Sequence, residues 1–122
     1  MILLTHDLRA ALIANHQKHA EPGHDPVPLV KLFSPIGAAT WLATELYPDG
    51  DTLFGLADLG FQCPELGTFS LMEIAAIRLP FGLSIERDLH FRTDQPLSLW
   101  AERSRQLGSI VLAEISLSGR IR

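Results

Sequence analysis

Proline and glycine divide this chain into short segments, and this punctuation constrains its fold more than any other feature of the sequence. Between Glu21 and Pro28, three prolines and one glycine occupy half of eight positions, so neither a helix nor a central strand can continue there. Three segments bounded by such turns, Leu29–Phe33, Thr40–Tyr47 and Thr52–Ala57, are rich in β-forming residues. The short turns between them favour an antiparallel meander.

Capping signals predict helices elsewhere in the chain. Thr5 is a suitable N-cap for a helix that ends by His19. Ser70 and Glu73 have the spacing of a capping box, which starts a further short helix. A third helix is expected from Leu97 to Gln106.

The segment from Leu83 to Phe91 alternates apolar and polar residues, which predicts a strand with one polar face. That face would carry Glu86, Asp88 and His90, with neighbouring residues about 6–7 Å apart. Two carboxylates and an imidazole can bind a divalent metal ion or perform acid–base catalysis, so these three residues are the catalytic candidates. The alternative is a solvent-exposed strand face, because no metalloenzyme signature has this spacing.

Three histidines are the metal-binding candidates. His16 and His19 are three residues apart, a spacing at which helical neighbours can share a ligand, and His24 could supply a third donor. A polar helix end explains the same residues without a metal. The sequence also contains no glycine-rich phosphate-binding motif, and we expect no cofactor.

The C-terminal segment from Ser109 to Arg122 fits either a strand or a helix. Ala113, Ile115 and Leu117 alternate as in a strand, which is the interpretation we prefer. Residues 1–122 are therefore predicted to form a single α+β domain. It would contain an antiparallel sheet of about four to six strands, with an N-terminal helix and one or two short helices packed on it.

Charge and cysteine content exclude several classes of protein. The 10 basic and 14 acidic residues give a net charge of −4, which argues against direct nucleic-acid binding through phosphate contacts. A lone cysteine, Cys63, cannot form an internal disulfide, and no apolar run approaches the ~20 residues of a membrane-spanning helix. We therefore expect a cytoplasmic protein without membrane contact.

The charge is unevenly distributed along the chain. Residues 99–122 contain four arginines against two glutamates, a net charge of +2, so residues 1–98 carry −6. This basic tail, and a tryptophan three residues after Leu97, could bind a protein partner, with a solvated surface and core packing as the alternatives. The partner-binding candidates are Trp100, Arg103, Arg105, Arg120 and Arg122.

Six short motifs occur in order through most of the chain. They are a Leu-Leu pair near the start, Val30-Lys31-Leu32-Phe33, Trp41-x-Ala43-Thr44-Glu45, Phe54-Gly55-Leu56, Glu65-Leu66-Gly67-x-Phe69-Ser70-Leu71-x-Glu73, and Gly82-Leu83-x-Ile85-Glu86-Arg87-Asp88-Leu89-His90-Phe91. From Ile2 to Leu99 the chain resembles the bacterial family called domain of unknown function 2958. Past Trp100 we see no resemblance, so residues 99–122 are expected to be a variable C-terminal extension of the same domain.

This resemblance implies a small accessory protein of plasmids, integrative elements and phages, and it implies no particular reaction. We therefore expect a non-enzymatic protein-interaction module of a mobile genetic element. Its expected partner is a host defence complex, of the restriction or CRISPR type, which it would inhibit by binding. Two alternatives stay open: a metal-dependent enzyme built on the Glu86–His90 strand, and a structural accessory subunit of a conjugative transfer system. The sequence also leaves a homodimer open.

Overall fold

Five strands form one antiparallel sheet in the computed structural model, which describes residues 1–118. In chain order the strands are β1 (Val30–Phe33), β2 (Thr40–Leu46), β3 (Thr52–Asp58), β4 (Glu65–Ser70) and β5 (Glu86–Arg87). Their order in the sheet is β4-β3-β2-β1-β5, and every neighbouring pair is antiparallel. The antiparallel meander predicted from the turn residues is therefore confirmed.

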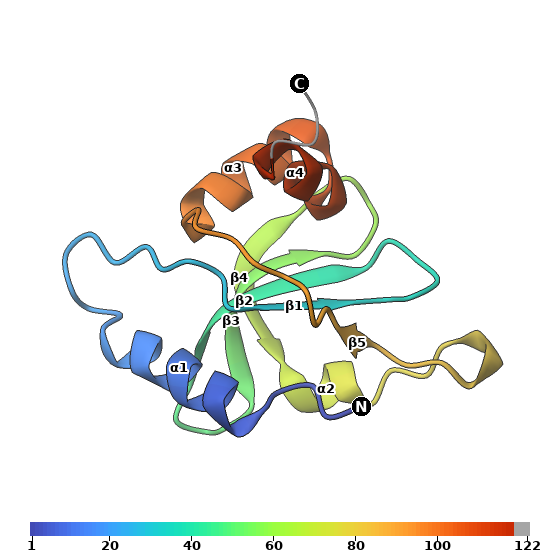
Figure 1. Ribbon diagram of the computed structural model, residues 1–122, viewed down its shortest axis with the longest axis horizontal. Helices are drawn as coiled ribbons and strands as arrows, with labels where there is room; N and C mark the ends of the chain where they lie inside the picture. The colour runs from blue at the N-terminus through green and yellow to red at the C-terminus, as the bar shows by residue number, and fades with distance from the viewer. Residues whose placement is uncertain (119–122) are drawn as a thin grey trace.

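Helices lie on both sides of this sheet (Figure 1). They are α1 (His6–Gln17), α2 (Leu71–Ala75), α3 (Leu97–Leu107) and α4 (Ile110–Leu117), with a short 3-10 helix at Pro80–Gly82. The predicted caps are present: the Thr5 hydroxyl accepts the Leu8 N–H, and the Ser70 hydroxyl accepts the Glu73 N–H, both at 3.1 Å. The single α+β domain follows the predicted class, with one more helix than expected in the C-terminal segment.

Two hydrophobic cores form, one on each face of the sheet. One core contains Leu12 of α1, Ile74 of α2 and the side chains of one sheet face. The other is built from Trp100 of α3, Ala113 of α4 and the opposite sheet face. Strand β2 is buried at all seven of its positions, because helices cover it from both sides.

The predicted strand from Leu83 to Phe91 is wrong for most of its length. Only Glu86 and Arg87 pair with β1. Beyond them the Asp88 carboxylate accepts the N–H of His90 at 2.9 Å, which turns the chain away from the sheet. Alternation of apolar and polar residues indicates only that the side chains suit a half-buried strand. Here a local turn contact, which the alternation does not reveal, overrides that preference.

The strand preferred for the C-terminal segment is also wrong, because residues 110–117 form helix α4. The Ser109 hydroxyl accepts the Leu112 N–H at 3.0 Å, and the buried Asp58 carboxylate accepts the Ile110 N–H at 3.0 Å. These two contacts satisfy orphan donors of the first helical turn. Ile110 and Ala113, three residues apart, then bury the same helical face.

No helix within residues 1–118 has both the length and the apolar character needed to cross a membrane.

Candidate functional site

The three predicted catalytic residues do not lie on one strand. Glu86 lies in β5 opposite β1, Asp88 follows the end of that strand, and His90 is exposed in the turn beyond it. The Lys31 ammonium lies 3.4 Å from Asp88 and 2.6 Å from Glu114, so the Asp88 carboxylate already has an ion-pair partner within the protein. Within residues 1–118, no group of three His, Cys, Asp or Glu side chains is placed to hold a metal ion.

Two of the three predicted metal-binding histidines instead converge on a carboxylate that the sequence analysis missed. His16 Nδ1 and His24 Nε2 each lie 3.1 Å from an oxygen of Glu45. The Glu45 side chain is only 7% exposed, and each of these histidines is 16% exposed. His19 does not reach the carboxylate, because its ring stacks on His16 and its Nδ1 donates to the His16 carbonyl at 2.7 Å.

A β-bulge in β2 brings Glu45 to this position. The register with β3 shifts between Ala43 and Glu45, so that Glu45 lies opposite Phe54, whereas Ala43 lies opposite Gly55. An extra residue in a strand reverses which face the following side chains occupy. The carbonyl of Thr44, the bulged residue, accepts a hydrogen bond from the Asn15 side chain at 3.0 Å, which attaches α1 to this end of β2.

The Glu45 carboxylate and the imidazoles of His16 and His24 form a clamp, which holds the chain segment between α1 and β1 against β2. A carboxylate only accepts hydrogen bonds, so His16 and His24 donate to it from Nδ1 and Nε2. The residue after His24, Asp25, accepts the backbone N–H and the hydroxyl of Ser98 at the start of α3. The proline-rich loop is thus attached to β2 on one side and to α3 on the other. The adjoining hollow, about 190 Å³, is also lined by apolar side chains.

The predicted partner-binding residues of the C-terminal segment have different environments. Trp100 is 2% exposed and donates its indole N–H to the Thr93 hydroxyl, so its ring packs in the core, the alternative that the sequence left open. Arg103 donates to the Ser116 hydroxyl and joins α3 to α4. Arg105 is exposed. Arg120 and Arg122 lie outside the described residues.

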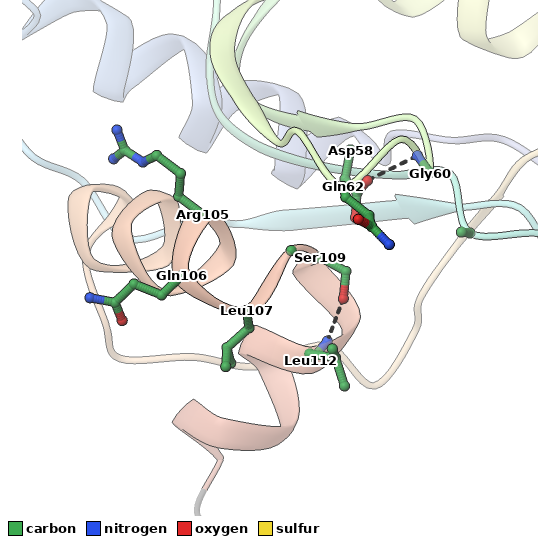
Figure 2. A pocket seen from close by; sticks show the side chains of 10 residues that line it. Asp58, Gly60, Gln62, Arg105, Gln106, Leu107, Ser109 and Leu112 are labelled. Carbon is green, nitrogen blue, oxygen red and sulfur yellow. Dashed lines mark hydrogen bonds between the residues drawn. The ribbon is translucent and has the colours of Figure 1, made fainter.

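Arg105 borders a hollow of about 510 Å³ (Figure 2). We call this hollow the corner hollow. It is lined from three places in the chain: Ala38 of the β1–β2 loop, Gly60 and Gln62 of the β3–β4 loop, and residues 105–112 of the α3–α4 corner. Asp58 fixes two of these places together, because its carboxylate accepts the Gly60 N–H at 2.9 Å and the Ile110 N–H at 3.0 Å.

Exposed apolar side chains line the corner hollow or lie next to its lining residues in the sequence. Leu107 and Leu112 line it, and both are exposed (Figure 2). Leu59 and Phe61 flank its lining residue Gly60, and they are 56% and 81% exposed. We call Leu59, Phe61, Leu107 and Leu112 the corner surface.

Cys63 lies beside this surface in the β3–β4 loop and is exposed. Its thiol donates to the Glu65 carboxylate at 3.5 Å. This hydrogen bond, with the negative charge of Glu65, raises the pKa of the Cys63 thiol above its usual range. The thiolate fraction at neutral pH is therefore lowered, which makes Cys63 a poor nucleophile.

Comparison with known proteins finds one family. The family model described as "Protein of unknown function (DUF2958)" matches residues 3–111. The match continues past Leu99 through α3 and into α4, so the likeness extends further than the sequence motifs indicated. Neither the curated proteins nor the solved structures contain a match to this chain.

Proposed function

We propose that this chain, which belongs to the family of proteins of unknown function DUF2958, is a protein-interaction module that binds its partner through the corner surface. The observation that carries this proposal is a set of four exposed apolar side chains: Leu107 and Leu112 line the corner hollow, and Leu59 and Phe61, on either side of its lining residue Gly60 in the sequence, line another hollow at the β3–β4 loop. Soluble domains seldom leave large apolar side chains grouped in this way without a partner to cover them.

The composition of this surface is that of a binding interface. Phe61 supplies a large aromatic side chain at the centre of an exposed loop, and such residues often dominate binding energy. Arg105, Gln62 and Gln106 border the same hollow and provide a polar rim. Asp58 holds the β3–β4 loop against α4, so the surface is organised before a partner arrives.

The test is capture of a partner by the full chain and by two matched variants. Phe61→Ser removes the aromatic ring from the corner surface. Phe81→Ser removes a ring that is 93% exposed in the 3-10 helix, away from the corner surface. Both variants should keep the stability of the wild type, because neither ring is buried. Phe61→Ser should weaken capture at least about tenfold, and Phe81→Ser should leave it unchanged.

Equal capture by the wild type and Phe61→Ser would contradict this proposal. A partner lost with Phe81→Ser alone would assign binding to another face of the protein.

A host defence complex is the partner class that we propose on the basis of the family resemblance. Cells expressing the chain should lose activity of one restriction or CRISPR system, and cells expressing Phe61→Ser should retain it. Undiminished defence across a panel of such systems would remove this partner class, whatever the capture experiment finds.

A further inference from the structure

Strand β4 forms one edge of the sheet, and its outer side is open. All six of its residues pair with β3, and within residues 1–118 no second strand pairs with it. Alternate residues of such a strand direct their N–H and C=O groups away from the sheet, where another strand can bind them.

The two edges of this sheet differ in how they are protected. The opposite edge, β5, has only two residues, and Arg87 donates its guanidinium to the carbonyls of Ile2 and Leu3, which brings the N-terminal segment against that edge. β4 has no lysine, no proline and no bulge against β3, and three of its residues are exposed. Its one charged residue is Glu65, at the start of the strand, so most of the usual devices that prevent strand addition are absent.

Two hollows flank the start of β4. One, about 430 Å³, is lined by Leu56 and Leu66, which are paired in the sheet, and by Ala101 of α3. The other, about 350 Å³, is lined by Ala57, Leu59 and Phe61. Side chains of an extended segment alternate between the two faces of a sheet, so successive apolar residues of an added strand would reach these two hollows in turn.

The open edge is continuous with the corner surface. Gln62 and Arg105 line both the corner hollow and the hollow beside Leu66, and Leu59 and Phe61 line the other hollow directly. A partner seated on the corner surface therefore lies next to the unpaired side of β4.

Acidic side chains lie at both ends of β4, and Arg105 of α3 is the basic residue that lines the hollow beside Leu66. Glu65 begins β4 and is exposed, and the exposed Glu73 follows three residues after its end. Asp51 lies at the same end, where it accepts the Ser70 hydroxyl at 2.6 Å. β4 itself contains no basic residue, and the chain carries a net charge of −4. A second copy of this chain would bring the same charge to the edge, whereas a segment with lysine or arginine at its ends is complementary to it.

We propose that the partner adds an extended strand to β4. Successive apolar side chains of this strand point alternately into the two hollows, and basic residues lie at its ends. This inference rests on the proposed function, since it names how the partner of the corner surface binds. The added strand supplies main-chain hydrogen bonds, and the two hollows provide selectivity for its side chains.

Amide hydrogen exchange of the full chain, with a synthetic peptide as probe, tests this mode of binding. The probe has the sequence threonine, valine, valine, valine, threonine between two lysines, so that neighbouring valines face opposite sides of the sheet; a second peptide has glutamates in place of the lysines. The lysine peptide at saturation should slow exchange of outward-facing β4 amides at least about tenfold and leave β2 unchanged. The glutamate peptide should bind about tenfold more weakly.

A pair of variants with the same added charge provides the control. Thr68→Lys places a positive charge on the exposed edge of β4 and should weaken the lysine peptide several-fold, while Gln17→Lys on α1 should not. Strand addition is overturned if the peptide leaves β4 exchange unchanged, if both peptides bind equally, or if β4 is protected without peptide as a dimer forms. Loss of partner capture in Phe61→Ser, with β4 still unprotected by the peptides, would overturn strand addition and leave the proposed function standing.

Discussion

Glu45→Ala should destabilise the protein by about 3 kcal/mol, because this carboxylate accepts hydrogen bonds from both His16 and His24 at 3.1 Å. A hydrogen bond to a charged group contributes roughly 1.5–3 kcal/mol, so the two together would contribute about 3–6 kcal/mol. The imidazoles are each 16% exposed, and water can replace part of what they lose. We therefore take the lower end of that range.

Urea unfolding at neutral pH, followed by the fluorescence of the two tryptophans, measures this loss. For a urea slope of about 1.5 kcal/mol per M, a loss of about 3 kcal/mol lowers the midpoint by about 2 M. Glu45→Gln should cost only about 1 kcal/mol, because an amide can accept from one imidazole and donate to the other in its second tautomer. Glu21→Ala removes an exposed carboxylate from the loop that contains His24. It is the matched control and should stay within about 0.5 kcal/mol of the wild type.

A double-mutant cycle separates the clamp from the loss of a buried side chain. His16→Ala should cost about 1.5 kcal/mol in the wild type, and at least about 1 kcal/mol less in Glu45→Ala, where its hydrogen-bond acceptor is already absent. Strictly additive effects, or a Glu45→Ala cost equal to that of Glu21→Ala, would refute the account of Glu45 as the centre of a stabilising clamp.

Three further predictions concern individual residues elsewhere in the structure. Gly55→Ala should cost at least about 3 kcal/mol in urea unfolding, because an added Cβ would lie 1.8 Å from the carbonyl oxygen of the adjacent strand, whereas Gly67→Ala meets nothing within 4 Å and should cost about 1 kcal/mol or less. Hydrogen bonds from the side chain of Thr52, and from the backbone of Thr52 and Asp51, lower the pKa of Asp49, so its contribution to stability is present above the ordinary aspartate pKa of about 3.9 and is lost as the pH falls through the lowered value. The difference in stability between wild type and Asp49→Ala should therefore shrink below about pH 4; a constant difference would contradict this assignment. Glu65→Gln should lower the raised pKa of Cys63 and speed its alkylation by iodoacetamide at neutral pH; an unchanged rate would mean that Glu65 does not control the thiol.

Local signals predicted much of the fold because the physical causes are themselves local. Thr5 and Ser70 satisfy backbone donors three residues away, and Gly108 ends α3 in the left-handed conformation with φ 85°. The β-forming segments between turn residues likewise needed only short connections to pair as a meander.

Two predictions of secondary structure were wrong, because contacts that the apolar–polar alternation does not reveal decide these segments. The segment after Gly108 is a helix partly because Asp58, 52 residues before Ile110, accepts its first N–H. The strand at residues 83–91 is short because a turn at Asp88 ends it, and Lys31 pairs with that carboxylate. Alternation along one segment contains no information about either partner.

In the candidate functional surfaces too, some features could be recognised in the sequence and others depend on the tertiary structure. The three histidines could be recognised in the sequence, but Glu45 could not be assigned to them, since a bulge at Thr44 decides which face of β2 it occupies. The corner surface likewise joins loops that are about 50 residues apart in the sequence, and only their packing brings them together.

By itself, the sequence determined the α+β class, the antiparallel meander, the family and most helix ends, because capping, turn formation and periodic burial act over a few residues. The tertiary structure alone decided which carboxylate the histidines bind, which edge of the sheet stays open and which apolar side chains remain exposed. Each of those outcomes depends on the arrangement of segments distant in the chain, and no local preference specifies it.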